Sequence, residues 1–195
     1  GYAAFDFLRT YSRHRPFKLA AHVARLFSSC SMMGLSLPWK ESDMCEIVLA
    51  TLAKNEDEPR EKFIKIMVSG GVAPGMVPVA EPTLIVLIDS VPEYPRAWYE
   101  GGVGVITEKF DRYLPFAKTN NYIEGVRQTM RAEREGAMEP VYYSDAQVYE
   151  GSNSSIFALI DGTLMTPKSN ILESITRRTL LNMLSLTVPI EERDF

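Results

Sequence analysis

One lysine stands in a setting that could make it a nucleophile. Residues 113–122 read YLPFAKTNNY, so Lys118 lies among apolar and neutral polar side chains where a helix is expected to begin. Burial disfavours the charged form of an amine, and a neutral lysine amine can form a Schiff base with a carbonyl compound. An ordinary surface lysine at a helix start has the same spacing, and spacing alone favours that simpler interpretation.

Two later segments supply groups that would complement such a lysine. Residues 148–157 (VYEGSNSSIF) place Glu150 at the end of an expected strand, before a turn rich in Gly, Ser and Asn. Residues 171–180 (ILESITRRTL) place Ser174 and Thr176 near the start of an expected helix, whose backbone N–H groups can bind a phosphate. A lysine, a carboxylate and a phosphate-binding helix terminus are the parts that a pyridoxal phosphate site requires, so that cofactor is a candidate.

Several other kinds of active site are absent from the sequence. It contains no G-x-S-x-G, H-E-x-x-H, P-loop or G-x-G-x-x-G motif. The two histidines are His14, expected to face solvent, and His22, expected on a helix surface, and neither is a catalytic candidate. Residues 56–58 (EDE) are expected to form a solvated loop, and Cys30 and Cys45 lack the spacing of a disulfide framework or zinc site. We therefore expect no metal and a reducing, cytoplasmic environment.

The composition is that of a globular protein without a nucleic-acid or membrane partner. The 195 residues are 46% hydrophobic and 24% charged, and 21 basic against 25 acidic residues give a net charge of −4. Proteins that bind nucleic acids or anionic membranes normally have a basic face. The longest notable apolar run, TLIVLI at 83–88, is far shorter than the roughly 18 residues that a transmembrane helix needs.

Helix and strand signals alternate along the chain, which predicts a mixed α+β fold. Apolar residues at helical spacing predict helices over 19–33 and 41–54, and Ser42 or Asp43 is the expected N-cap of the second. On the first helix, the polar residues His22, Arg25 and Ser29 are expected on a different part of the surface from the apolar set. The other predicted elements are strands at 5–11, 63–68, 83–89, 103–108, 139–144 and 187–193, helices at about 120–135 and 173–186, and a hairpin whose Asp161-Gly162 pair suits a type I′ turn.

Five segments, in this order, resemble the fold-type IV pyridoxal-phosphate enzymes. The segments are FDFLRTY (5–11), HVARLFSSC (22–30), LPFAKTNNY (114–122), VYEGSNSSIF (148–157) and LMTPKSNILESITR (164–177). That family includes branched-chain aminotransferases, D-amino-acid aminotransferases and aminodeoxychorismate lyase. The resemblance runs through nearly the whole chain and implies two domains of the D-amino-acid aminotransferase kind, a homodimer and bound pyridoxal 5'-phosphate.

The resemblance implies a role for each residue that matches a family motif. Lys118 would form the Schiff base with the cofactor and then move a proton to and from the substrate Cα. Glu150 would pair with the pyridine nitrogen of the cofactor. Arg25, from the H-x-x-R-L motif, would bind the phosphate, together with the backbone N–H groups of Ile175 and Thr176.

Further residues are implied to contact the cofactor ring or the substrate. Leu172 would pack on the ring, Tyr122 would donate to its 3′ oxygen, and Phe5 and Lys65 are the candidate substrate contacts. Lys65 stands where branched-chain aminotransferases commonly have Arg, so their way of binding the substrate carboxylate is open for this chain. Lys118 and Tyr122 are four positions apart, a spacing closer to the D-amino-acid and lyase branches than to the branched-chain enzymes.

The resemblance also implies a domain organisation. Prolines and paired glycines mark residues 91–102 as a linker between a small N-terminal α/β domain, 1–90, and the first part of a larger cofactor-binding domain, 103–195. Family members begin earlier and continue past position 195. We therefore expect a C-terminal part to be missing from this chain.

The resemblance favours transamination between an amino acid and a 2-oxo acid, with a branched-chain-type donor and a Lys118 Schiff base. The N-N-Y sequence after the lysine looks like an aminotransferase. Ser174 and the Ser154-Ser155 pair depart from the residues that the family usually has. The alternative is 4-amino-4-deoxychorismate lyase, which releases pyruvate on the same scaffold. A third possibility is a non-catalytic relative or an incomplete fragment.

Overall fold

The predicted α+β class is confirmed by the computed structural model, which describes residues 2–12, 14–55, 60–78, 81–184 and 188–195. The chain separates into two compact units. Unit 1 comprises Gly1–Glu93 and Ala117–Asn121, and unit 2 comprises Tyr94–Phe116 and Tyr122–Phe195. The short segment around Lys118 is therefore part of unit 1, although the chain on both sides of it belongs to unit 2.

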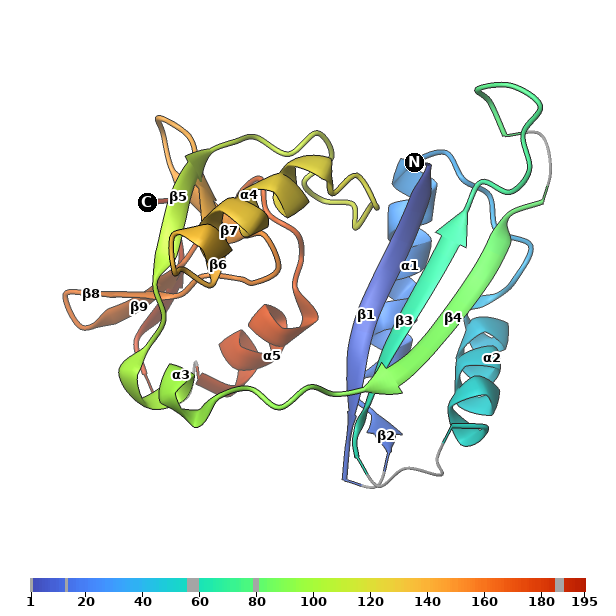
Figure 1. Ribbon diagram of the computed structural model, residues 1–195, viewed down its shortest axis with the longest axis horizontal. Coiled ribbons are helices and arrows are strands. Elements are labelled where there is room, and N and C mark those ends of the chain that lie inside the picture. The colour runs from blue at the N-terminus through green and yellow to red at the C-terminus, as the bar shows by residue number, and fades with distance from the viewer. Residues whose placement is uncertain (1, 13, 56–59, 79–80, 185–187) are drawn as a thin grey trace. The chain divides into compact units, whose positions relative to one another are not determined.

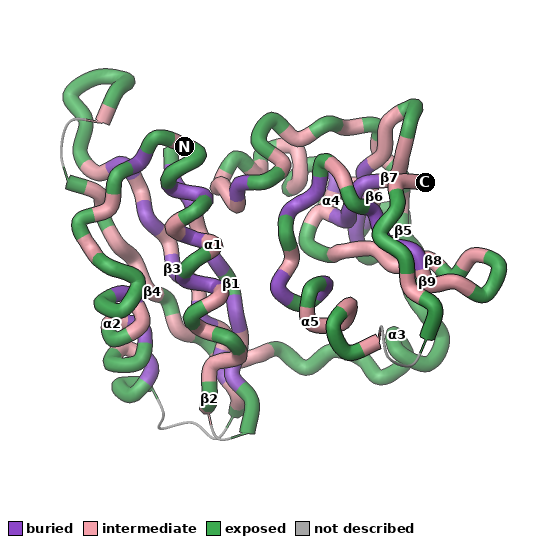
Figure 2. The backbone as a smooth tube through the Cα atoms, turned by 180° about the vertical axis from the view of Figure 1, so that it is seen from behind, coloured by how far each residue is buried: buried purple, intermediate pink, exposed green. Residues whose placement is uncertain are grey.

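Unit 1 is an antiparallel sheet with two helices on one face (Figure 1). The strand order is β2 (Arg15–Pro16), β1 (Ala3–Tyr11), β3 (Lys62–Ser69) and β4 (Thr83–Ser90), and the helices are α1 (Leu19–Met32) and α2 (Glu41–Ala53). Side chains alternate between the two faces of each strand, so every second residue of β3 points toward the helices and is buried. Buried residues accordingly lie along β1, β3 and α1 (Figure 2).

Both predicted helices of unit 1 are confirmed, but the cap of the second lies earlier in the chain than expected. Lys40 is the N-cap residue of α2, in place of the predicted Ser42 or Asp43. The carboxylate of Asp43 accepts a hydrogen bond from the Lys40 backbone N–H at 3.0 Å. An acidic side chain in the first turn of a helix also interacts favourably with the helix dipole. Asp43 thus stabilises the start of α2 from inside the helix.

The polar residues of α1 do not lie on the surface as predicted. His22 is 7% exposed and Ser29 is fully buried at 0%, and both are on the side of α1 that packs against the sheet. Their polar atoms are buried because unit 1 supplies hydrogen-bond partners for them, which helical periodicity cannot reveal. The acidic residues 56–58, predicted to form a solvated loop, lie outside the described residues.

Unit 2 contains two three-stranded sheets (Figure 1). One has the order β5 (Val105–Lys109), β6 (Glu139–Tyr143) and β7 (Val148–Gly151), and the other has the order β10 (Ile190–Glu192), β9 (Thr163–Thr166) and β8 (Ala158–Ile160). Each contains one parallel pair, β5 with β6 and β9 with β10. The helices α4 (Ile123–Arg134) and α5 (Ile175–Leu184) precede β6 and β10, as connections between parallel strands require.

Two local features of unit 2 bear on the sequence predictions. Residues Arg96–Gly101 form the short helix α3, which lies within the predicted linker. In the β8–β9 hairpin, Asp161 and Gly162 have φ angles of 49° and 79°, so the predicted two-residue turn with positive φ is confirmed. No helix in the described parts of the chain combines the length and apolar character needed to cross a membrane.

Candidate active site

The main chain of Lys118 is fixed on both sides by unit 1. The backbone N–H of Phe5, in β1, donates to the Lys118 carbonyl oxygen at 2.9 Å, and the Lys118 N–H donates to Ser29 Oγ, in α1, at 3.0 Å. Two residues further, the N–H of Asn120 donates to the carbonyl oxygen of Ala3 at 3.0 Å. The segment around Lys118 therefore runs along the edge of β1 as a short antiparallel extension of the sheet.

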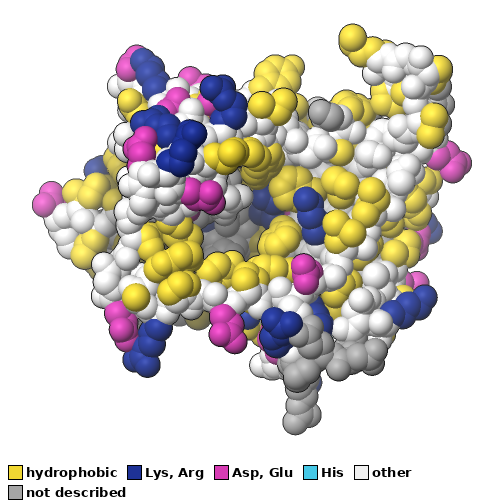
Figure 3. Space-filling view, in the orientation of Figure 1, with side chains coloured by type: hydrophobic (Ala, Val, Ile, Leu, Met, Phe, Trp, Pro, Cys, Tyr) yellow, Lys and Arg dark blue, Asp and Glu magenta, His cyan; other side chains and the backbone are white. Residues whose placement is uncertain are grey.

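The side chain of Lys118 lies against an aromatic ring of the same sheet. Its Nζ is 4.8 Å from the centroid of the Phe5 ring, and Lys65 Nζ is 5.0 Å from the same centroid. Strand register pairs Phe5 with Met67 and Met67 with Ile85, so these three apolar side chains form one row across the sheet. On this face, hydrophobic side chains cover β1, β3 and β4, with Lys or Arg side chains among them (Figure 3). The structure thus brings Phe5, Lys65 and Lys118 together.

Arg25 is held by a buried carboxylate that the sequence analysis did not identify. Asp6, fully buried at 0% exposure, accepts hydrogen bonds from Arg25 Nε and Nη2, both at 2.8 Å, and from His22 Nδ1 at 2.7 Å. Burial raises the pKa of Asp6, but the hydrogen bonds and positive charges of His22 and Arg25 outweigh it and hold the pKa below the ordinary value. Asp6 is therefore a carboxylate that orients the Arg25 guanidinium.

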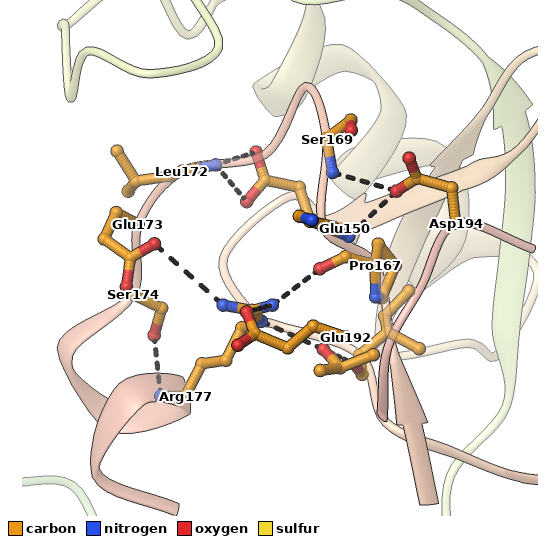
Figure 4. A network of polar contacts seen from close by, with 12 residues as sticks. Glu150, Pro167, Ser169, Leu172, Glu173, Ser174, Arg177, Glu192 and Asp194 are labelled. Atoms are coloured by element: carbon orange, nitrogen blue, oxygen red, sulfur yellow. Dashed lines mark hydrogen bonds and ion pairs between the residues drawn. The ribbon is translucent and has the colours of Figure 1, made fainter. Parts of the chain in front are cut away.

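In unit 2, Glu150 and Leu172 are joined directly. Glu150 lies near the end of β7 and is 7% exposed, and the backbone N–H of Leu172 donates to both of its carboxylate oxygens, at 3.3 and 3.2 Å (Figure 4). The guanidinium of Arg112 forms an ion pair with the same carboxylate. Buried carboxylates need such partners, because an unpaired buried charge is costly. The structure therefore supplies a carboxylate that is oriented by its partners and lies beside the leucine expected to cover the cofactor ring.

The start of α5 leaves two backbone donors available. The N–H of Arg177 donates to Ser174 Oγ at 3.2 Å and that of Arg178 donates to the Ser174 carbonyl oxygen at 2.9 Å. Among the residues that the structure describes, the N–H groups of Ile175 and Thr176 have no hydrogen-bond acceptor. The first N–H groups of a helix carry partial positive charge and suit an anion such as a phosphate.

Tyr122 directly precedes α4 and is half-buried. Its carbonyl oxygen accepts the N–H of Val126 at 2.8 Å, so it is the residue from which the helix starts. The Tyr122 ring and the Tyr142 hydroxyl both lie close to Gly125. A Cβ at position 125 would be 3.4 Å from each of them. Burial, with a smaller contribution from Tyr122, raises the pKa of Tyr142 to about 12. Tyr142 is therefore a neutral phenol at physiological pH.

A buried arginine, which the sequence analysis missed, joins α5 to β9. Arg177 is 2% exposed, and its guanidinium donates to Thr166 Oγ1 at 3.0 Å, to the Pro167 carbonyl oxygen at 2.8 Å and to Glu192 at 2.7 Å (Figure 4). It follows directly after Ile175 and Thr176, so it holds the start of α5 in place. The only sequence signal is a pair of arginines in the first turn of the helix, where acidic residues are usual.

Glu139 organises the turn that follows Glu150. Its carboxylate accepts hydrogen bonds from the Ser152 hydroxyl at 3.2 Å and the Asn153 backbone N–H at 3.0 Å, and from the hydroxyl of Ser154. Gly151 is required beside it, because a Cβ at that position would lie 2.6 Å from Glu139 Oε2. The serine-rich turn that resembled a family motif is therefore built around a buried carboxylate.

The residues of each unit have the chemistry that pyridoxal phosphate requires. Unit 1 offers a half-buried amine on a fixed main chain and an oriented guanidinium. Unit 2 offers a buried carboxylate and two helix N–H donors without an acceptor among its described residues. These groups match the aldehyde, phosphate and pyridine nitrogen of the cofactor. Within the described ranges, no cluster of three or more His, Cys, Asp or Glu residues could hold a metal ion.

Comparisons with known proteins identify the family of this chain. The family model for amino-transferase class IV matches residues 3–195. A D-alanine aminotransferase from Listeria monocytogenes is 26% identical over all of this chain and 70% of its own length, and a branched-chain-amino-acid aminotransferase from Pseudomonas aeruginosa is 29% identical over 94% of this chain and 64% of its own length.

Solved structures show the same fold. A branched-chain aminotransferase from the archaeon Thermoproteus uzoniensis superposes with a TM-score of 0.86, at 20% identity, over all of this chain and 69% of that one. Another branched-chain aminotransferase, solved with pyridoxamine 5'-phosphate, gives a TM-score of 0.89 at 22% identity, over 99% of this chain and 68% of that one.

Proposed function

This chain belongs to the class IV aminotransferase family, whose cofactor is pyridoxal phosphate, and we propose that it transfers an amino group between an amino acid and a 2-oxo acid. The observation that carries the proposal is the setting of Lys118. Its main chain is hydrogen-bonded to both α1 and β1, and its Nζ lies 4.8 Å from the Phe5 ring centroid. A lysine whose position is this closely specified suits covalent attachment better than a surface role.

The resemblance to the family assigns the cofactor contacts to the following residues. Lys118 would bind it through Nζ, and Glu150 would contact the pyridine nitrogen. Arg25 would bind the phosphate as a guanidinium, together with the N–H groups of Ile175 and Thr176. Leu172 would cover the ring, which its backbone bond to Glu150 favours, and Tyr122 would donate a hydrogen bond to the ring hydroxyl oxygen.

When bound, pyridoxal phosphate supplies an electron sink for the electron pair left at the substrate Cα. Lys118 Nζ would take the proton from Cα, and would return a proton on the cofactor side, so one amine would act as base and then as acid. The Glu150 carboxylate would keep the pyridine nitrogen protonated. Because donor and acceptor would use the same site in turn, we expect ping-pong kinetics.

The surroundings of Lys118 support a donor with an apolar side chain. The row of Phe5, Met67 and Ile85 forms an apolar surface on the sheet face where Lys118 lies. Lys65 lies beside the same ring and could bind the carboxylate of the substrate. We therefore propose a branched-chain-type donor.

The second candidate function is 4-amino-4-deoxychorismate lyase. The four-residue spacing of Lys118 and Tyr122 supports it over the branched-chain enzymes, because this spacing is closer to the D-amino-acid and lyase branches. The lyase would release pyruvate without an added 2-oxo acid, whereas transamination requires that acceptor. L-valine, D-alanine and aminodeoxychorismate are each assayed with and without an added 2-oxo acid. The substrate that is converted, and its need for the acceptor, distinguish the candidate activities. A non-catalytic relative would turn over none of the three substrates.

The test of the proposed function begins with cofactor attachment. The protein is mixed with pyridoxal phosphate, its visible absorbance is recorded, and borohydride reduction is followed by peptide mapping. We expect a visible band and a reduced adduct on Lys118. Lys118→Ala should lose both the adduct and turnover while keeping its circular dichroism spectrum, whereas Lys109→Ala, at an exposed lysine, should retain both. Turnover near the parent rate in Lys118→Ala would refute the mechanism.

Two broader properties complete the proposal. We propose a homodimer, as the resemblance to fold-type IV enzymes implies, and a cytoplasmic location, which two free cysteines favour. Sedimentation of the holoenzyme would measure the first, and fractionation of cells that express the protein would measure the second. A monomer with full turnover would remove the dimer from the proposal without affecting the assignment of Lys118.

A further inference from the structure

We propose that the hydroxyl group of Ser29 is a positioning group for Lys118, which it fixes to the same helix face that carries Arg25. The inference rests on the proposed function, because it assigns to Ser29 a role in placing the two residues that would hold the cofactor. Ser29 itself contacts the main chain of Lys118 rather than the reacting atoms.

The two backbone groups of Lys118 are bound to different elements. Its N–H donates to Ser29 Oγ of α1 at 3.0 Å, and its carbonyl oxygen accepts the Phe5 N–H of β1 at 2.9 Å. A shift of Lys118 along the sheet edge would break one of these bonds, and a shift away from α1 would break the other. Ser29 is fully buried at 0% exposure, so water cannot replace its oxygen without a local opening of unit 1.

The acceptor on α1 is a side-chain oxygen. The backbone hydrogen bonds of the helix do not use Ser29 Oγ, so it can bind the Lys118 N–H without competing with them. Serine supplies this acceptor without bulk. Alanine at position 29 would remove the Ser29 Oγ acceptor from the Lys118 N–H, and losing a buried acceptor of a backbone N–H group is costly.

Arg25 is attached to the same two elements. It lies four residues before Ser29 on α1, which places the two side chains on one face of the helix, about 6 Å apart along its axis. Its guanidinium is bound by Asp6, which follows Phe5 in β1. Lys118 and Arg25 are therefore both attached to α1 and to adjacent residues of β1, Lys118 through Ser29 and Phe5 and Arg25 through Asp6. This arrangement would keep the distance between the amine and the guanidinium constant.

The experiment compares Ser29→Ala with Ser28→Ala, a matched control at an exposed serine one position earlier on α1. Two quantities are measured on the full chain: the dissociation constant for pyridoxal phosphate from the absorbance titration, and hydrogen–deuterium exchange of peptides that contain Lys118. For Ser29→Ala we expect about tenfold weaker cofactor binding and faster exchange at Lys118, as the loss of one buried hydrogen bond predicts. Ser28→Ala should match the parent protein in both.

Each outcome decides one question. If the parent protein forms no adduct on Lys118, the proposed function fails and this inference fails with it. If the parent forms the adduct and Ser29→Ala equals Ser28→Ala in affinity and exchange, only the positioning role is overturned. A lower melting temperature alone, with affinity and Lys118 exchange unchanged, also overturns it.

A second pair of variants covers the case in which Ser29→Ala does not fold. Ser29→Thr keeps an acceptor oxygen and Ser29→Cys keeps only a weak one, so we expect cofactor affinity to be greater in the threonine variant. Equal affinity of the two variants would refute the role.

Discussion

Replacing Asp6 with asparagine tests whether the buried carboxylate holds α1 against β1. The substitution keeps the shape of the side chain and removes its charge, so His22 and the Arg25 guanidinium lose the anion that now lies 2.7 and 2.8 Å away. Removing one partner of a buried ion pair costs about 3–5 kcal/mol. Arg25 keeps a small contact with solvent, so we expect a loss of about 3 kcal/mol in the free energy of unfolding at pH 7.

The sign of the pH dependence gives a second, independent check. The pKa of Asp6 is lower in the folded protein than in the unfolded chain, so its stabilising contribution is present above the unfolded pKa of about 3.9 and is lost as the pH falls through the lower, folded pKa. The asparagine side chain of the variant does not titrate. The difference in stability between the parent and Asp6→Asn should therefore shrink as the pH falls below about pH 4.

Urea denaturation, followed by circular dichroism at several pH values, measures both effects. With a typical slope of about 2 kcal/mol per molar urea, the expected loss moves the midpoint by about 1.5 M. Asp89→Asn is the matched control, since it makes the same change at an exposed carboxylate of β4 and should move the midpoint by less than about 0.3 M. A deficit for Asp6→Asn no larger than that of the control, or one that persists unchanged into acid, would show that the carboxylate is not a charged anchor.

Three further predictions concern other buried groups of the protein. Arg177→Lys should lower the free energy of unfolding by about 2–4 kcal/mol, because an ammonium group cannot reproduce the three contacts of the planar guanidinium; a loss under about 1 kcal/mol in thermal denaturation would contradict this. Gly151→Ala should cost about 1–3 kcal/mol through crowding against a carboxylate, whereas Gly162→Ala, whose Cβ would meet open space at a φ of 79°, should cost only about 1 kcal/mol; equal losses would refute the crowding argument. Burial raises the pKa of the Cys30 thiol to about 11, so a thiol reagent at pH 8 should label Cys45 first and Cys30 only after unfolding; equal labelling rates in the folded protein would contradict this.

The elements of the fold could be predicted from the sequence because their signals are local. Apolar residues at helical spacing located α1 to within one residue of its observed end, and the Asp161-Gly162 pair identified the β8–β9 turn. The first residue of α2 was predicted correctly but its N-cap was not, because Asp43 stabilises the helix from its third position. Periodicity identifies an element, and it leaves its cap ambiguous when several polar residues follow one another.

The buried polar residues could not be predicted from the same signals. His22 and Ser29 were expected at the surface because polar residues usually are, and what keeps them inside is a partner far away in the sequence. The bond from Lys118 to Ser29 spans 89 positions. Such pairs appear only when strand pairing has placed β1 beside α1, so no window of the sequence contains both members. Glu139 and Arg177 escaped notice for the same reason, since each binds groups that the fold brings together.

The same reasoning explains why the sequence next to Lys118 did not by itself identify this lysine as the residue that would bind the cofactor. Lys118 and Tyr122 are four residues apart, yet the structure groups the first with unit 1 and the second with unit 2. The reactivity expected of Lys118 depends on contacts with Phe5 and Ser29, which belong to the N-terminal part of the chain, and a local pattern around position 118 records none of them. A resemblance that extends over five segments includes both ends of these contacts. The resemblance is therefore informative because it includes β1, α1 and the lysine segment together, which are the elements that pair over long distances in the sequence.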